Sequence, residues 1–230
     1  MCMEYTLYVI TDEAIAGGRS HATIAREAVR GGAGIIQLRG KGMSGAELAA
    51  AGRELRAITK RGGAALIVND RLDVAIACGA DGVHLGRNDM PVGTARQLAP
   101  PGFIIGASVG SAAEAAEAVR AGADYVAASP VFATTSKDDA GPGCGLDGLR
   151  EIRRAVAVPV IAVGGIGPED VDAVVQAGAD GIAVISAVVA APDIARAARE
   201  LKGRVLACRR GAGRRTGAGK STGGKKRNCF

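Results

Sequence analysis

Cationic and acidic side chains follow several of the short apolar runs in this chain. Arg39, Lys41, Asp70 and Asp89 each come just after such a run. Positive side chains bind phosphate groups, and one or two carboxylates together with phosphate oxygens are the usual ligands of Mg²⁺. We therefore predict a site for phosphorylated ligands in which Asp70 and Asp89 hold one Mg²⁺ per subunit. The alternative is that each carboxylate caps a neighbouring helix, Asp89 the one that follows Pro91.

Two further segments have the pattern of a phosphate cradle. Gly164-Gly165-Ile166-Gly167 and Ser186 each follow an apolar run and lead into a predicted helix. Helix N-termini and bare glycine amides attract anions. With the cations of the other segments, these donors exceed what one phosphate needs, so we expect two separate anions to bind.

Eight apolar runs must position these side chains. They lie at 6–10, 34–38, 65–69, 82–86, 103–107, 125–129, 159–163 and 181–185, and Ala-rich helical patterns separate them. Almost continuously apolar runs are typical of parallel strands covered on both faces. Every second run follows Gly-Ala-(Asp/Gly), at 32–34, 79–81, 122–124 and 178–180. We expect a single-domain α/β fold, a (β/α)8 TIM barrel over residues 1–207, with its site where the strands end. A doubly wound open sheet is the alternative.

Three polar residues near these runs have other interpretations. His84 lies inside the run at 82–86, so we expect a core histidine with satisfied hydrogen bonds, or an orienting one, rather than a catalytic base. His21 opens a predicted helix and is expected at the surface. Asp12 is expected to accept a hydrogen bond within its own turn.

The composition excludes several classes of protein. The five cysteines show no C-x-x-C pair or metal-site spacing, which indicates a reducing, cytoplasmic location. The N-terminus has no signal-peptide pattern, and no stretch reaches the roughly 18 apolar residues of a membrane span. We therefore expect no membrane partner.

The basic character of the chain belongs to its end. Residues 208–230 contain eight Lys and Arg and no Asp or Glu, so removing them changes the net charge from +6 to −2. Their GAGKST segment lacks the first glycine and the strand of a phosphate-binding P-loop. We predict a disordered basic tail over 208–230 and no binding of nucleic acid, with a nucleic-acid-binding arm as the alternative.

Seven segments together carry a family resemblance. They are QLRGK (37–41), VNDR (68–71), GVHLGRND (82–89), GAS (106–108), PVFATTSK (130–137), AVGGI (162–166) and AVIS (183–186). In this order they resemble the thiamine-phosphate synthase family, over residues 5–202. The resemblance implies a barrel that joins an aminopyrimidinylmethyl diphosphate to a thiazole phosphate, or its carboxylated form, and releases pyrophosphate.

The resemblance also implies roles for individual residues. The pyrimidine diphosphate would bind to Gln37, Leu38, Arg39, Gly40, Lys41, Asn69, Ser108 and Lys137. The thiazole phosphate would bind to Thr134, Thr135, Ser136, Gly165, Ile185 and Ser186. Catalysis would depend on Lys137, Arg39, Lys41 and Ser108, and Mg²⁺ on Asp70 and Asp89.

The chain departs from the family pattern at two positions. Gly40 stands where the family often has a charged residue, and Ser136 where it often has Thr. The alternative functions are a thiazole tautomerase-like isomerase on the same barrel, or a non-catalytic phosphate-ligand protein with a nucleic-acid-binding tail. Gly110 stands where we would expect the histidine of a tautomerase. The pattern leaves open whether the chain forms a homo-oligomer.

Overall fold

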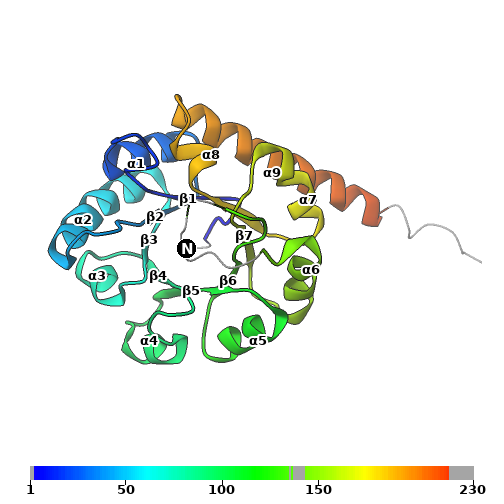
Figure 1. Cartoon of the computed structure of the whole chain (residues 1–230), viewed down its shortest axis with the longest axis horizontal. Coiled ribbons are helices and arrows are strands. Elements are labelled where there is room, and N and C mark those ends of the chain that lie inside the picture. The colour runs from blue at the N-terminus through cyan, green and yellow to red at the C-terminus, as the bar shows by residue number, and fades with distance from the viewer. Residues whose placement is uncertain (1–2, 135, 137–142, 218–230) are drawn as a thin grey trace, which may run out of the picture.

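Parallel strands close into a barrel in the computed structural model, which describes residues 3–134, 136 and 143–217. In that part of the chain the strands are β1 (Leu7–Ile10), β2 (Ile35–Leu38), β3 (Ala65–Asn69), β4 (Gly82–Leu85), β5 (Ile104–Val109), β6 (Tyr125–Ala128), β7 (Val160–Val163) and β8 (Gly181–Val184). Each strand pairs with the next, and Val9 of β1 pairs with Val184 of β8 to close the ring (Figure 1). The predicted (β/α)8 barrel is confirmed, and the open sheet is excluded.

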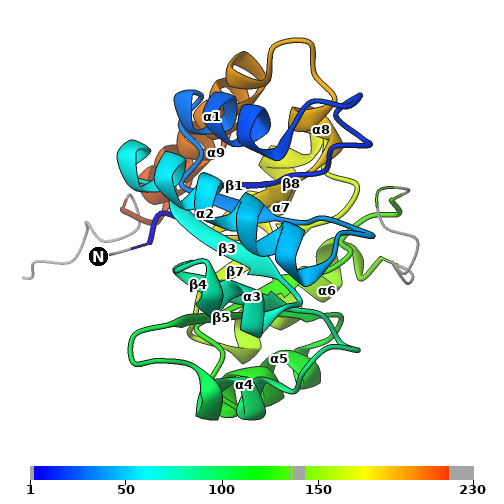
Figure 2. The same cartoon turned by 90° about the vertical axis from the view of Figure 1, so that its left-hand side faces the viewer.

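Helices surround the strands on the outside (Figures 1 and 2). They are α1 (His21–Arg30), α2 (Gly45–Gly62), α3 (Leu72–Ala77), α4 (Val92–Leu98), α5 (Ala112–Arg120), α6 (Gly145–Ala155), α7 (Val171–Gln176), α8 (Ser186–Val189) and α9 (Ile194–Gly217), with a 3₁₀ turn η1 (Pro168–Asp170) before α7. Helix α2 begins with the predicted capping box, in which Glu47 N donates to Ser44 Oγ and Ser44 N donates to Glu47 Oε2.

Helix α9 passes the point where the sequence predicts a disordered tail to begin. It packs against α1 and α7 and continues to Gly217, so residues 208–217 are helical. Cys208 contacts the hydrophobic core from this helix. The expected boundary therefore falls inside a helix, and residues 218–230 lie outside the described residues.

The Asp residues of the Gly-Ala-Asp repeat lie just before β4, β6 and β8, at the end of the barrel where the strands begin. In each copy the Asp carboxylate accepts from a backbone N–H of the preceding strand and from an Arg of the helix before it. The contacts are Asp81 Oδ2 with Leu66 N (2.8 Å) and Arg56 (2.9 Å), Asp124 Oδ2 with Ile105 N (2.7 Å) and Arg96 (2.5 Å), and Asp180 Oδ2 with Val160 N (2.9 Å) and Arg153 (2.7 Å). Each Asp therefore fastens an even strand to the odd strand before it.

The copy at 32–34 has Gly34 in place of Asp, and Glu4 supplies a carboxylate nearby. Glu4 Oε1 accepts from Thr6 N at 2.8 Å, and its other oxygen accepts from Lys202 Nζ at 2.7 Å. A Cβ on Gly34 would lie 2.2 Å from Glu4 O, so only glycine fits beside this substitute. Lys202 comes from α9, which precedes β1 around the closed ring. Lys202 Nζ also donates to Gly32 O at 2.7 Å, so this lysine joins the segment before β1 to the segment before β2.

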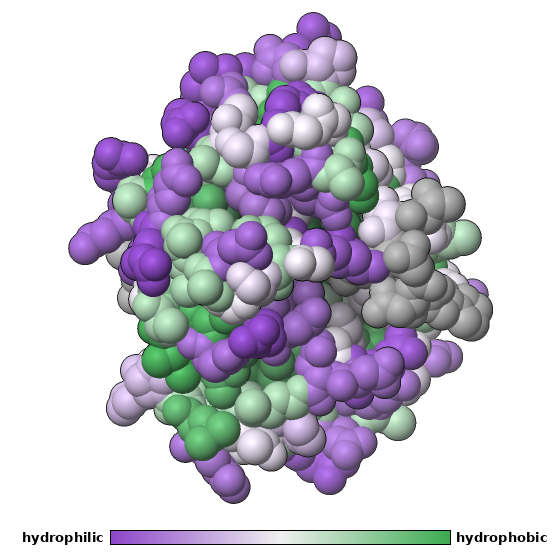
Figure 3. Space-filling view, turned by 60° about the vertical axis from the view of Figure 1, so that its left-hand side comes forward, coloured by the Kyte–Doolittle hydropathy of each residue, from purple (hydrophilic) through white to green (hydrophobic). Residues whose placement is uncertain are grey.

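The core contains mainly aliphatic side chains, with Tyr8 and Tyr125 buried at its centre. Hydrophilic residues cover much of the face in Figure 3, with apolar areas between them. Ile76, Met90 and Leu98 are exposed large hydrophobic residues. Among the described residues, no helix has the length and apolar character needed to cross a membrane.

Candidate active site

Two adjoining pockets open where the strands end. The first, here called the cationic pocket, has a volume of about 430 Å³ and is lined by Arg39, Gly40, Lys41, Met43, Leu48, Asn69, Asp70, Arg71, His84, Gly86, Arg87, Asn88, Asp89, Ser108, Ser129 and Pro130. The second, the glycine pocket, has a volume of about 650 Å³ and is lined mainly by residues 133, 134, 136, 163–169 and 183–187, together with Ser129 and Pro130. Both volumes suit small ligands. Ser129 and Pro130 belong to both pockets, so ligands bound in the two would be neighbours.

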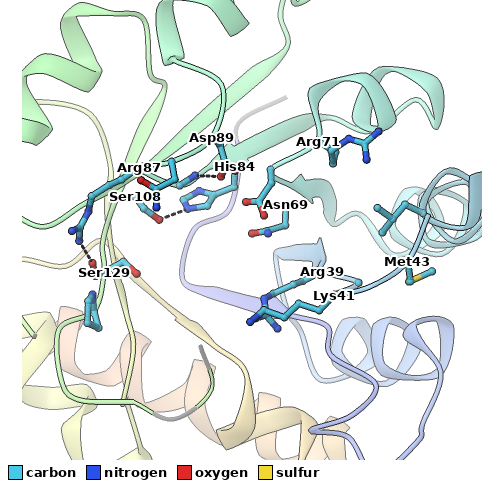
Figure 4. A pocket seen from close by; sticks show the side chains of 16 residues that line it. Arg39, Lys41, Met43, Asn69, Arg71, His84, Arg87, Asp89, Ser108 and Ser129 are labelled. Carbon is cyan, nitrogen blue, oxygen red and sulfur yellow. Dashed lines mark hydrogen bonds between the residues drawn. The ribbon is translucent and has the colours of Figure 1, made fainter. Parts of the chain in front are cut away.

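Arg39 reaches the cationic pocket from the end of β2 but is already engaged. Its guanidinium forms an ion pair with Asp12 at the end of β1, and its side chain is only 5% exposed. Asp12 also accepts from Ile15 N at 3.1 Å, as predicted for its turn. The ion pair fixes Arg39 against the wall of the pocket, whereas Lys41 lies exposed at the rim. Figure 4 shows both cations extending toward the side that carries His84 and Ser108.

Gly40, between these two cations, departs from the family pattern for a reason visible in the structure. A Cβ at this position would lie 2.2 Å from Met43 Sδ and 2.9 Å from Leu48 Cδ2. Met43 and Leu48 therefore fill the space that a side chain at residue 40 would occupy, and the wall of the pocket is closed there by apolar groups.

Asn69 and Asp70 form a tight turn at the end of β3. Arg71 N donates to Asn69 O at 2.7 Å, and Asp70 has a positive φ of 65°. Asp70 N also donates to His84 O at 2.8 Å, which holds the turn against β4. Positive φ is uncommon outside glycine and favours Asp and Asn among the other residues. The strained turn places the Asp70 side chain at the cationic pocket, while Arg71 pairs with Asp73 and points away from its centre (Figure 4).

Asp89 closes its own turn after β4. Its Oδ2 atom accepts from Gly86 N at 2.6 Å. Helix α4 begins at Val92 with Pro91 as its N-cap and no side-chain cap, so the alternative that Asp89 caps this helix is wrong. Asp89 instead lines the cationic pocket together with Asp70 and Asn69.

The carboxylates of the cationic pocket suit a divalent cation that shares its ligands with substrate. No group of three or more His, Cys, Asp or Glu that could hold a metal occurs among the described residues. Mg²⁺ is commonly bound by one or two carboxylates plus phosphate oxygens and water. Asp70 and Asp89 provide such a pair, so the donor set fits Mg²⁺ bound together with a phosphorylated ligand.

His84 on β4 and Ser108 on β5 are hydrogen-bonded to each other. His84 is buried, with Nε2 at 2.9 Å from Ser108 Oγ and Nδ1 at 3.0 Å from Tyr125 OH. The predicted burial of His84 is confirmed, and both of its ring nitrogens have hydrogen-bond partners. Ser108 is half-buried and lines the cationic pocket, and Figure 4 shows its hydroxyl turned toward the imidazole.

The glycine pocket is built from backbone. Gly164 and Gly165 follow β7 with φ values of 96° and 62°, and a Cβ on Gly165 would lie 2.5 Å from Ala133 O. Only glycine allows this close approach. Ser186, the first residue of α8, and Ile185 complete the wall. Thr134 and Ser136 also line this pocket, and Ser136 N donates to Thr134 Oγ1 at 3.1 Å. Thr135 and Lys137 lie outside the described residues.

Three predicted placements differ from the structure. Leu38 points outward, since its Cδ2 lies 3.6 Å from a Cβ placed on Gly52 of α2, so its side chain does not reach a pocket. Gln37 lies deeper than the cationic pocket, in the barrel interior. The prediction that His21 lies at the surface is wrong: it is 4% exposed, with Nδ1 at 2.8 Å from Thr11 Oγ1.

Met43, Leu48 and Arg87 line the cationic pocket, although no role was predicted for them from the sequence. Arg87 lies 3.4 Å from Glu114 and donates to Ser129 O at 2.9 Å. It therefore holds Ser129, which lines both pockets. Its position directly after Gly86, at the end of β4, is the signal that could have marked it.

Comparisons with known proteins agree with this geometry. The family model described as thiamine monophosphate synthase matches residues 7–188. The thiamine-phosphate synthase of Methanoregula boonei is 66% identical, covering 88% of this chain and 94% of the relative, and that of Methanoculleus marisnigri is 60% identical, covering 90% and 98%. The solved thiamine phosphate pyrophosphorylase from Pyrococcus furiosus superposes with a TM-score of 0.83 at 45% identity, covering 90% of this chain and 98% of that one. The chain therefore belongs to the thiamine monophosphate synthase family, a family of transferases.

Proposed function

We propose that the chain is a thiamine-phosphate synthase, which joins an aminopyrimidinylmethyl diphosphate to a thiazole phosphate and releases pyrophosphate. The observation that carries this function is the pair of adjoining pockets that share Ser129 and Pro130. One pocket combines cations with carboxylates and the other is lined by glycine backbone, so the site suits two anionic ligands held side by side. The relatives' shared name supports the same activity.

The cationic pocket is assigned to the pyrimidine diphosphate. Arg39 and Lys41 supply positive charge, and Asn69 and Ser108 supply neutral hydrogen-bonding groups on the neighbouring walls. Lys137, outside the described residues, is assigned to the same ligand by the family resemblance. Charged hydrogen bonds to phosphate are stronger than neutral ones, so the diphosphate end would be anchored by the cations.

Asp70 and Asp89 would hold Mg²⁺ at this pocket. When bound there, the cation would neutralise charge on the diphosphate and so make it a better leaving group. The positive φ of Asp70 supports this assignment, because strained residues that persist in a fold are concentrated at functional sites.

The glycine pocket is assigned to the thiazole phosphate. Gly164, Gly165 and Ser186 line it, and Thr134 and Ser136 would add hydroxyl groups. Thr135, outside the described residues, is assigned to the same ligand by the family resemblance. A phosphate held here would place its thiazole ring toward Ser129 and Pro130, next to the pyrimidine. Binding the two rings in contact replaces an encounter in solution with one inside the site.

The chain's residues favour a dissociative reaction. Arg39 and Lys41 would stabilise the charge that grows on the departing diphosphate, leaving a pyrimidinylmethyl cation that the thiazole nitrogen captures. No protein nucleophile is required. Cys144, near the pocket mouth, would be a poor one, since burial raises the pKa of its thiol and keeps it protonated.

The isomerase alternative needs an acid–base group in the loop after β5. At Gly110, where a tautomerase histidine would be expected, a Cβ would lie 2.9 Å from the Arg87 guanidinium. Glu114 accepts from Gly110 N at 2.8 Å and lies 3.4 Å from Arg87. These contacts support a structural role for this loop and favour the synthase.

The test is to incubate the protein with both phosphorylated substrates, with and without Mg²⁺, and to assay coupled product and pyrophosphate. We expect equal amounts of both, strongly reduced when the cation is chelated. Conversion of the thiazole compound alone, with no pyrophosphate, would instead support the isomerase. Binding of both compounds without any conversion would support a non-catalytic protein.

The two phosphorylated compounds are the only partners proposed. We place the reaction in the cytoplasm, because five cysteines without paired spacing suit a reducing compartment. The tail at 208–230 has no assigned part in the reaction.

A further inference from the structure

Five polar side chains form a continuous chain of hydrogen bonds across the barrel interior. Gln37 Nε2 donates to Tyr8 OH at 2.6 Å, and Tyr8 OH lies 3.1 Å from Tyr125 OH. Tyr125 OH lies 3.0 Å from His84 Nδ1, and His84 Nε2 lies 2.9 Å from Ser108 Oγ. The five residues belong to β2, β1, β6, β4 and β5. This set, here called the relay, runs from Ser108 at the cationic pocket to Gln37 in the barrel interior.

The hydrogen bonds of the relay must all run in the same donor-to-acceptor direction. Burial raises the pKa of Tyr8 and of Tyr125 well above the usual tyrosine value, so both keep their hydroxyl hydrogen at neutral pH. Each hydroxyl has a single hydrogen to donate. If Tyr8 accepts from Gln37, its own hydrogen goes to Tyr125, and the hydrogen of Tyr125 goes to His84 Nδ1. The imidazole then carries its proton on Nε2 and donates it to Ser108.

This direction defines the two ends of the relay. Ser108 Oγ accepts from His84, so its own hydrogen is left to donate to a ligand in the cationic pocket. At the other end, Gln37 Oε1 is fully buried and has no hydrogen-bond partner among the described residues. Gln37 and Ser108 both line the same small interior cavity. This interior cavity is therefore lined by one donor, the Ser108 hydroxyl, and one acceptor, Gln37 Oε1.

The packing around Tyr125 holds the relay in place. A Cβ on Gly106 of β5 would lie 2.0 Å from Cζ of the Tyr125 ring, so the ring occupies space that only glycine leaves. The ring also stacks on His84, with centroids 5.7 Å apart and an interplanar angle of 23°. Phe at residue 125 would keep both packing contacts and remove only the hydroxyl.

We propose that Tyr8, Tyr125 and His84 are positioning residues that fix Gln37 Oε1 as an acceptor and the Ser108 hydroxyl as a donor toward the substrate ring. The inference rests on the proposed function, in which the pyrimidine binds beside Ser108; the edge of its ring would then lie over the small interior cavity that Ser108 shares with Gln37. An aminopyrimidine presents an amino donor and a ring-nitrogen acceptor, which complement this polarity. An oxo-pyrimidine presents a carbonyl oxygen and a ring N–H, which oppose it, so the relay selects between them.

The test combines substrate kinetics with a double-mutant cycle. In Tyr125→Phe we expect KM for the aminopyrimidine diphosphate to rise about 10-fold, because one oriented hydrogen bond is lost, with KM for the thiazole phosphate changed less than about twofold. In a Ser108→Ala background the same substitution should cost clearly less in kcat/KM than in the wild type, because only the Gln37 end of the relay remains to be oriented. An equal loss in both backgrounds would show a general structural effect and overturn the inference.

Equilibrium binding separates this inference from the proposed function. We expect the wild type to bind the aminopyrimidine diphosphate at least about 10-fold more tightly than its oxo analogue, and Tyr125→Phe to lose most of that preference. Tyr5→Phe is the matched control, since its ring contacts Tyr125 at a centroid distance of 5.6 Å but its hydroxyl is not in the relay. Tight binding with no preference would overturn the relay alone. Absence of both binding and turnover in the wild type would overturn the proposed function as well.

Discussion

Arg39 and Asp12 form an ion pair at the mouth of the barrel, between the ends of β2 and β1. The Arg39 side chain is 5% exposed and that of Asp12 12%, so the pair is shielded from water. Breaking a buried pair by removing one partner leaves an uncompensated charge. Arg39 therefore has two roles, as a source of positive potential for the diphosphate and as a structural link between two strands.

Substitution of Arg39 and substitution of Lys41 should differ in their effect on stability. We expect Arg39→Ala to lower the free energy of unfolding by about 3 kcal/mol, because Asp12 is left unpaired, and to reduce turnover as well. Lys41→Ala, at an exposed position, should change the unfolding free energy by less than about 0.5 kcal/mol while lowering kcat/KM about 10-fold or more. Denaturant unfolding and steady-state kinetics measure the two quantities.

The control for Arg39→Ala is Arg196→Ala. Arg196 pairs with Glu200 on the surface, where the side chains are 73% and 62% exposed, and such solvent-screened pairs contribute little to stability. Similar losses in the two variants would contradict a structural role for the Arg39–Asp12 pair.

Substitutions of Asp70 should distinguish metal binding from backbone strain. We expect Asp70→Asn to keep its stability, because Asn tolerates the observed φ of 65°, and to lose about 100-fold or more in turnover with a higher Mg²⁺ requirement. Asp70→Ala should also lose about 1 kcal/mol of unfolding free energy. Titration of activity with Mg²⁺ and thermal unfolding provide the two readouts. Full turnover by Asp70→Asn at low Mg²⁺ would rule out Asp70 as a ligand.

The contacts of Asp81, Asp124 and Asp180 lie at the end of the barrel away from the pockets, so they should stabilise the fold without affecting the reaction. Asp124→Ala removes an acceptor for Ile105 N and for Arg96, so the unfolding free energy should fall by about 1–2 kcal/mol with kcat unchanged. Glu200→Ala is the control, because it breaks only an exposed pair within one helix. A loss of kcat in Asp124→Ala at a temperature where the protein is folded would contradict this separation.

Much of the fold could be predicted from local sequence. The strands begin and end within one or two residues of the apolar runs, because buried parallel strands show as continuous apolar segments. The same feature hides which side chains face inward. Alternation is not visible in such runs, so Tyr8 and Tyr125 could not be recognised as interior polar groups, and Leu38 could not be recognised as pointing outward.

The differences in the site arise from contacts between distant segments. Asp12 and Arg39 are separated by 27 residues, and nothing local to either residue predicts that they pair. His21 has the sequence position of a surface residue at a helix start, but the turn after β1 folds over it and Thr11 binds its ring. The gathering of candidate residues at one mouth was predictable, because the carboxyl ends of the strands converge there.

His21 should make stability depend on pH below neutrality. Burial lowers the pKa of His21 below its usual value of 6.5, partly offset by Glu13 and Asp12. Below pH 6.5 the unfolded chain therefore takes up a proton that the folded chain resists, so stability is lost as the pH falls from 6.5 toward the folded pKa. We expect a lower unfolding free energy at pH 5.5 than at pH 7.5. The non-titrating His21→Asn should show a smaller decrease, and an equal decrease would assign the effect to other groups.

Ser186 and Asn69 should report on different substrates, because they line different pockets. Ser186→Ala removes a hydroxyl at the start of α8, and a hydrogen bond to a charged group contributes about 1.5–3 kcal/mol. We expect KM for the thiazole phosphate to rise about 10-fold or more, with KM for the pyrimidine diphosphate changed less than about twofold. Asn69→Ala should show the opposite selectivity. Steady-state kinetics with each substrate varied in turn measures both constants. If either variant raised the two constants equally, the pockets would not act as separate subsites, and the two-anion arrangement would have to be abandoned.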